Sequence, residues 1–308
     1  MAPRFFKLPK FCLSLLATLL SCHLQADASH QFSLSLNHSH IEFIDGSAAF
    51  QSISGSAYFK PVEKSAALPY SRTTFYTRTG SFSVAAAQQE WEDMLVVIGP
   101  SVFNSGDIRY YSAGTFLAKS DLPVWGSLRY QYIDEMRYNF ADGSHFNSPS
   151  ESVKHATLGW YIQDTLSLYA FYSKQEPNNY GAGVIKLFNL SEFGFLETQL
   201  QISQTDKKEK IPDTQSNVVR NLDVSSEQER AGYFAITYFP FVQTALKLSY
   251  QRIEHLNLGL ETNYFSTGIE QYLFDDIRLG LNYTHTDTHF IQSFGDSETY
   301  NLSLSFDF

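Results

Sequence analysis

The sequence predicts an all-β fold, a single transmembrane antiparallel β-barrel of about 14 strands, with 12 and 16 as alternatives and no plug domain. Three observations lead to this prediction. The C-terminal residues alternate strictly between apolar and polar side chains. No segment after the N-terminal leader approaches the roughly 18 apolar residues that a spanning helix needs. Short segments of alternating polarity recur along the chain, separated by short and longer connections in turn.

The last strand carries the clearest pattern. Its apolar face comprises Tyr300, Leu302, Leu304, Phe306 and Phe308. Its polar face comprises Asn301, Ser303, Ser305 and Asp307, because strand side chains alternate with period two. The segment resembles the C-terminal strand of Gram-negative outer-membrane barrels, whose terminal Phe is recognised by the barrel-assembly machinery. The alternative is an edge strand of a soluble sandwich.

Residues 1–28 read as a secretory signal. Arg4, Lys7 and Lys10 precede an apolar run that ends in a small-residue cleavage site, with cleavage after Ala28 and Ala26 as an alternative. Both cysteines lie in this segment, so residues 29–308 offer neither disulfide nor thiolate chemistry. The net charge of −10 becomes about −12 once the signal is removed, which argues against nucleic-acid binding. The aromatic share of 16% suits a barrel with aromatic girdles.

Alternation and turn residues predict the strands in order. In the first half they are residues 31–43, 48–60, 81–103, 108–119, 124–138, 153–162 and 166–174. In the second half they are residues 180–190, 195–205, 230–240, 245–255, 258–274, 277–289 and 300–308. The alternation changes phase near residues 266–268, as a β-bulge would make it. The long polar connection over residues 206–229 is either a surface loop or an inward constriction.

The connection over residues 58–70 contains Pro61 and Pro69, which exclude a paired central strand there and predict an ordered link. The order of Tyr58, Phe59, Pro69, Phe75 and Arg78 is similar to that of a general bacterial porin family of Gram-negative outer-membrane β-barrels. Residues 70–74 depart from the small, acidic residues of that family. The resemblance implies a barrel that passes small solutes.

Charged residues that alternate with apolar neighbours are candidates for the inner wall. Arg129, Lys186, Glu197, Lys247 and Arg278 are predicted to line the pore, with Lys154, Glu261 and Glu270 as further candidates. Such charges tune solute and ion selectivity, and their mixed signs argue against a strongly ion-specific pore. The predicted function is a passive water-filled channel for small hydrophilic solutes or ions in the outer membrane.

The predicted partners are outer-membrane lipid, lipopolysaccharide and the barrel-assembly machinery, in a monomer or homotrimer. The alternative is a structural or adhesive barrel that contacts lipopolysaccharide without transport. His155, Ser173 and Asn189 supply residue types used in hydrolases, but no catalytic motif, so no enzyme is predicted. His285, Asp287 and His289 share one strand face that faces the headgroup zone, so neither a metal nor a cofactor is predicted.

Overall fold

The computed structural model describes residues 29–43, 46–64, 67–98, 101–119, 121–135, 137–140, 145–175, 178–205, 228–256, 260–274, 276–289 and 296–308. The predicted signal and nearly all of the 206–229 connection lie outside these residues.

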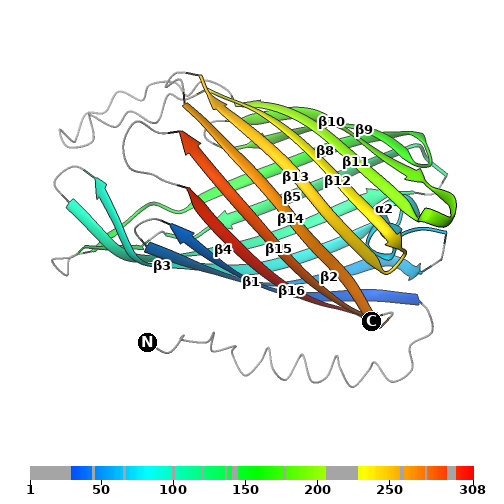
Figure 1. The fold of residues 1–308 in the computed structure, drawn as a ribbon, viewed down its shortest axis with the longest axis horizontal. Helices are drawn as coiled ribbons and strands as arrows, with labels where there is room; N and C mark the ends of the chain where they lie inside the picture. The colour runs from blue at the N-terminus through cyan, green and yellow to red at the C-terminus, as the bar shows by residue number, and fades with distance from the viewer. Residues whose placement is uncertain are drawn as a thin grey trace.

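The described strands form one closed antiparallel barrel (Figure 1). Fourteen strands make the ring: β1 (Ser29–Phe43), β2 (Gly46–Glu63), β3 (Ser81–Ile98), β4 (Ser101–Ala118), β5 (Val124–Ile133), β8 (Glu151–Gln163), β9 (Leu166–Lys174), β10 (Asn179–Asn189), β11 (Phe195–Thr205), β12 (Glu229–Phe241), β13 (Thr244–His255), β14 (Leu260–Phe274), β15 (Ile277–His289) and β16 (Ser297–Asp307). Pairing of β1 with β16 closes the ring. The predicted strand number is therefore confirmed.

Two short strands lie outside the ring. The segment predicted as one strand over residues 124–138 divides into β5 and β6 (Arg137–Phe140), and β7 (His145–Asn147) pairs with β6. β6 also pairs with β4 over Phe103–Asp107, whereas β5 pairs with β4 only from Tyr110 onward. The long β4 thus offers a free edge that a local hairpin covers, which alternation within one segment does not reveal.

The connections differ in length at the two ends of the barrel. Apart from the connection between β2 and β3, the end that holds the C-terminus has tight turns, such as Asp164–Thr165 between β8 and β9 and Val242–Gln243 between β12 and β13. The opposite end has two-residue connections between β1 and β2 and between β3 and β4, but longer ones elsewhere, including that between β11 and β12. Outer-membrane barrels have short periplasmic turns and long external loops, so we call the C-terminal end periplasmic.

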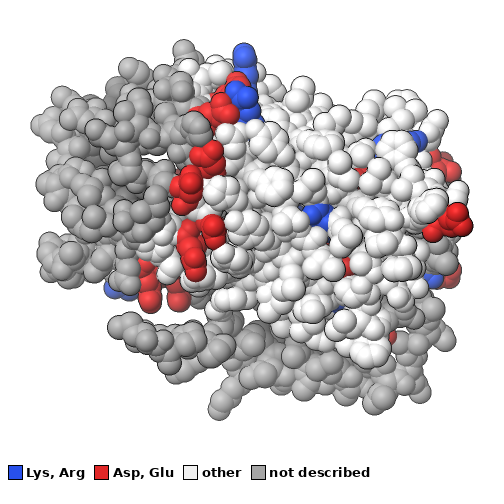
Figure 2. All heavy atoms as spheres, viewed as in Figure 1, with Lys and Arg blue, Asp and Glu red and all other residues white. Residues whose placement is uncertain are grey.

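Large apolar side chains cover the outer wall. They include Leu128, Leu158, Trp160, Ile202, Leu246 and Leu302, all more than 40% exposed. Figure 2 shows the resulting belt, with few charges in it and a row of acidic side chains along its extracellular edge. Such a belt is stable only against hydrocarbon, and the closed ring satisfies the backbone hydrogen bonds there.

No helix in the described part of the chain is long and apolar enough to cross a membrane.

Three further local expectations are wrong. The strand predicted over residues 81–103 ends at Ile98, and residues 101–107 belong to β4. The register of β14 runs unbroken through residues 266–268, and its irregularity lies between Tyr272 and Phe274. The apparent phase change arises because Tyr264 has the parity of the inner wall, opposite to exposed Phe265. Pro61 lies within β2 although its ring removes a donor. It is tolerated because pairing with β3 ends at Tyr58.

Candidate channel constriction

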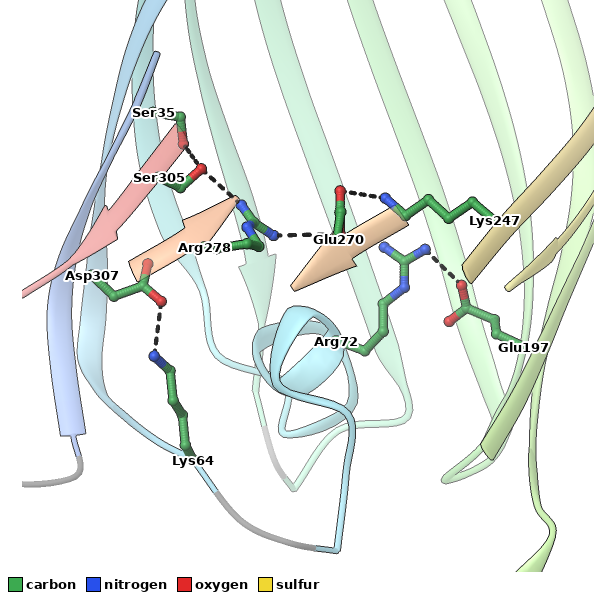
Figure 3. Close-up of polar contacts among 9 residues, drawn as sticks. All are labelled: Ser35, Lys64, Arg72, Glu197, Lys247, Glu270, Arg278, Ser305 and Asp307. Atoms are coloured by element: carbon green, nitrogen blue, oxygen red, sulfur yellow. Dashed lines mark hydrogen bonds and ion pairs between the residues drawn. The ribbon is translucent and has the colours of Figure 1, made fainter. Parts of the chain in front are cut away.

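The connection between β2 and β3 folds into the periplasmic end of the barrel. Residues 64–80, of which 65–66 lie outside the description, form η2 (Tyr70–Arg72) and α2 (Thr73–Tyr76) (Figures 1 and 3). We call this stretch the inserted segment. Pro69 starts the turn, and the Thr73 hydroxyl donates to its carbonyl over 3.2 Å. No long helix or separate domain fills the described barrel, but this short connection does enter it.

Aromatic side chains fix one side of the inserted segment. The Phe75 ring packs against Tyr76, Phe116, Trp125 and Tyr161, with centroid distances of 5.1 to 6.1 Å. The Tyr161 hydroxyl donates to the Phe75 carbonyl over 2.7 Å. These contacts join the segment to β4, β5 and β8, and burial of such rings contributes most of the packing free energy.

The other side of the segment packs against β10–β13. Tyr76 joins a buried cluster with Leu187, Phe195, Phe239 and Ala245. The Tyr70 amide donates to the carbonyl of Val242, in the β12–β13 turn, over 2.9 Å. The inserted segment therefore crosses the lumen and narrows its periplasmic end.

A buried carboxylate accepts two contacts from the segment. Arg72 Nη2 lies 2.7 Å from Glu197 Oε1, and the Tyr76 hydroxyl donates to Glu197 Oε2 over 2.9 Å. The Glu197 side chain is only 6% exposed, so both contacts form away from bulk water. Burial, followed by the negative charge of Glu197, raises the pKa of Tyr76 and keeps its hydroxyl protonated.

Charges of alternating sign continue along the wall (Figure 3). Glu270 pairs with Lys247 and, at 4.0 Å, with Arg278. Arg278 also donates to the Ser305 hydroxyl over 3.3 Å. Below it, Lys64 of the inserted segment pairs with Asp307 at 3.0 Å. One carboxylate thus serves two cations, which leaves a local surplus of positive charge.

Two cavities lie inside the barrel. One, of about 210 Å³, is bordered by Arg72, Glu197 and Lys247 and by polar residues of β11–β15. The other, of about 390 Å³, is bordered by Arg129 and His155 and by serines of β3, β5 and β9. Polar cavities of this size hold water.

The predicted pore residues divide between the two faces. Arg129 and Glu197, with Lys247 and Arg278, lie on the inner wall. Lys186 lies on the outer face, where it donates to Gln163 and Thr165 at the periplasmic turn. Its placement was predicted wrongly because both faces of β10 are apolar there.

The inner apolar residues of β10 pack against the inserted segment rather than lipid, and Leu187 shows this directly. Lys154 and Glu261 are also on the outer face, since they pair with Tyr130 and with Glu254, which lie on that face. Glu270 faces inward as expected.

The predicted C-terminal face also appears in the structure. Tyr300, Leu302, Leu304 and Phe306 pair in register with outer-face residues of β1 and β15. The Phe308 amide donates to the Phe32 carbonyl over 2.7 Å, and its ring stacks on Phe306 with centroids 6.4 Å apart. The role of this strand as an assembly signal remains a prediction.

The residues considered for hydrolysis and for metal binding make other contacts in the structure. His155 and Ser173 meet through a 2.5 Å hydrogen bond, but the second ring nitrogen of His155 contacts the Thr157 hydroxyl at 3.0 Å. Among the described residues, no carboxylate contacts this ring in the way that the orienting carboxylate of a hydrolytic triad would. His285 and Asp287 lie on the outer face, and no described group of three metal-ligating side chains gathers anywhere.

Comparisons with known proteins concern the fold alone. No family model and no curated protein matches the chain. Acinetobacter baumannii outer membrane protein Omp33 is similar with a TM-score of 0.57 and 12% identity, over 92% of this chain and 100% of that one. The Pseudomonas putida toluene transporter TodX reaches 0.54 with 11% identity, over 92% and 91%. A Pseudomonas aeruginosa FadL homologue reaches 0.50 with 7% identity, over 91% and 90%.

The belt, the closed ring and these likenesses agree. The chain is a multi-pass β-barrel of the outer-membrane type.

Proposed function

We propose that this protein is an outer-membrane channel for small hydrophilic solutes, with the inserted segment as its constriction. The observation that carries the proposal is the contrast between the two faces of the wall. The outer face is apolar, whereas the inner face carries hydroxyl and amide groups that hydrogen-bond across strands. Examples are Ser35 with Ser305, Asn37 with Ser52, Ser266 with Thr284 and Asn301 with Ser39.

A barrel of this strand number has room for water unless its own chain fills it. The inserted segment crosses the lumen at one end and leaves polar cavities beside it. Solutes pass through these cavities, and the segment sets the size limit. The channel is therefore narrower than a fully open barrel.

The charges at the constriction set its selectivity. Those described around the segment and the cavities are the cations Lys64, Arg72, Arg78, Arg129, Lys247 and Arg278 and the carboxylates Asp164, Glu197, Glu270 and Asp307. Charges lining a pore weight the passage of ions of opposite sign. The mixture favours a weak preference for anions over cations.

The likeness to TodX supports a channel, and the polar wall favours hydrophilic solutes over the hydrocarbon named for that protein. An alternative is a structural or adhesive barrel without transport. Conductance distinguishes the two functions, because a structural or adhesive barrel would not conduct.

Conductance in planar bilayers tests the proposal. We expect the native barrel to give steady steps on the order of a fraction of a nanosiemens. A variant in which a short Gly-Ser linker replaces residues 66–77 should give larger steps, because the constriction is removed. A correctly inserted barrel that stays silent in both forms would contradict the channel and favour the structural barrel.

A further inference from the structure

A groove of about 550 Å³ lies on the outer wall over β3, β4, β5, β8 and β9. Its small outward side chains are Ala113, Thr115 and Ala156, and its larger ones are Phe82, Leu128, Tyr130 and Tyr172. These larger side chains are 44% to 56% exposed, so the groove is open to the surrounding lipid. Its shape and apolar lining suit an acyl chain.

Two lysines stand at the extracellular end of this groove. Lys154 on β8 and Lys174 on β9 are directly opposite each other in the register and both are exposed. Like charges in this arrangement are destabilising. No ion pair with a described residue relieves either of them. An anion bound between the two ammonium groups would remove this repulsion.

The position along the strand sets the depth in the membrane. Lys154 lies three residues after the extracellular start of β8 at Glu151. The outward side chains that follow it, Ala156, Leu158, Trp160 and Ile162, are exposed down to the periplasmic turn. The two lysines are therefore at the headgroup level of the outer leaflet.

The lysine pair differs from the other charges on the extracellular edge of the belt. On β1 and β13–β16 the outward carboxylates near this end are Glu254, Glu261, Asp287, Glu298 and Glu42. The outward arginines there, Arg230 and Arg252, lie beside Glu254, whereas the two lysines form no ion pair with a described carboxylate. Figure 2 shows the acidic row on the visible face. An anionic headgroup would be repelled along that row and attracted at the lysines.

A second outer groove, of about 810 Å³ over β9–β13, is a weaker candidate. Its Arg252 pairs with Glu254 at 3.0 Å and Glu261 at 2.8 Å, and its other cation, Arg230, lies opposite Glu254 in the register. The two carboxylates offset the two arginines, so this groove offers a headgroup no surplus of positive charge.

We propose that the groove and its lysine pair form a binding site for lipopolysaccharide. A lipid A phosphate lies between Lys154 and Lys174, and an acyl chain of the same molecule lies in the groove below. Lipopolysaccharide is favoured over phospholipid because the site is in the outer leaflet and combines a pair of cationic side chains with an apolar groove. The site is separate from the channel, so each proposal can fail without the other.

Native mass spectrometry of the purified full barrel in detergent tests the site, with lipopolysaccharide, its dephosphorylated form and phosphatidylglycerol as probes. We expect the native barrel to retain one lipopolysaccharide. The double variant Lys154→Gln/Lys174→Gln should bind it about 30-fold more weakly, given the usual contribution of a surface cation to anionic-lipid binding. Removing the phosphates from the lipid should weaken binding by a similar factor.

Three controls keep the test specific. Lys60→Gln/Lys119→Gln removes the same charge from exposed sites near the periplasmic end and should bind as the native barrel does. Lys154→Arg/Lys174→Arg should retain binding, because the charge is kept. Ala156→Trp should weaken binding with both lysines present, because it fills the groove. Equal binding by the native and Gln forms, or equal affinity for phosphatidylglycerol, would overturn the assignment.

Discussion

Arg72 of the inserted segment lies 2.7 Å from Glu197 of β11, and this ion pair joins the segment to the barrel wall. The same carboxylate accepts the Tyr76 hydroxyl. Two contacts from the segment thus converge on one side chain whose remaining surface is buried. The position of the constriction depends on this carboxylate more than on any single aromatic contact. Removing the carboxylate leaves Arg72 and the Tyr76 hydroxyl without their acceptor, and an unpaired buried polar group costs more free energy than the loss of one ring contact.

Replacing Glu197 should loosen the inserted segment. In Glu197→Ala, Arg72 and the Tyr76 hydroxyl lose their acceptor, at a cost of about 1–3 kcal/mol. We expect noisier or larger conductance steps, measured by single-channel recording. We also expect unfolding at a lower temperature, measured by heat-dependent migration on gels. Glu192→Gln, exposed on the β10–β11 turn, should leave both unchanged. An unaltered conductance in Glu197→Ala would show that the segment is held by packing alone.

The contact between Tyr76 and Glu197 makes stability depend on pH at the alkaline end. Because its pKa is raised, the folded protein keeps the Tyr76 proton at a pH where the unfolded chain loses it. The contribution is therefore present below the ordinary tyrosine pKa of about 10 and declines as pH rises above it. Urea unfolding across this range should show the decline. Tyr76→Phe should reduce it, and an identical pH profile in both proteins would contradict the assignment.

Ion selectivity should respond to inward charges and not to outward ones. Lys247→Gln leaves Glu270 with Arg278 alone and makes the constriction more negative, so permeability should shift toward cations. Lys186→Gln removes the same charge from the outer face and should have no effect. Reversal potentials under a KCl gradient measure both. A larger shift in Lys186→Gln than in Lys247→Gln would reverse the placement of the two lysines.

Gly159 permits the close approach of Trp125 on the inner wall. A Cβ at this position would lie 2.1 Å from the indole ring, which donates from Nε1 to the Ser167 hydroxyl over 2.8 Å. Gly159→Val should therefore displace the ring and destabilise the barrel by about 1–3 kcal/mol. Gly232→Val is the matched control, since a Cβ there meets nothing within 4 Å. Equal unfolding midpoints for the two variants would contradict this packing.

Removal of Phe308 should impair assembly in cells. The deletion loses the hydrogen bond to Phe32 and the ring stack on Phe306, and with them the terminal residue expected to be recognised by the assembly machinery. We expect little folded barrel in outer-membrane fractions, while refolding into detergent in vitro is retained. Adding a polar tail after Phe308 serves as the comparison, because the aromatic is kept but is no longer terminal. Normal membrane levels of the deletion would argue against the signal.

The strand order and most facing assignments followed from alternation alone. Over residues 246–251 of β13 and 277–284 of β15 the apolar residues share one parity and the polar residues the other, so alternation alone puts Lys247 and Arg278 on the inward face, where the structure has them. The rule failed at Lys186 because the inner face of β10 is apolar too. It also failed at Lys154, whose parity matches the outward residues Ala156 and Leu158.

The sequence by itself determined a closed antiparallel barrel with an apolar exterior, because side-chain alternation and turn spacing are local properties that lipid and backbone hydrogen bonding enforce everywhere. Only the tertiary structure decided that residues 64–80 enter the lumen. Their anchors, from Asp307 to Glu197 and Trp125, lie on strands far apart in the sequence, and closing the barrel is what brings them around one short connection.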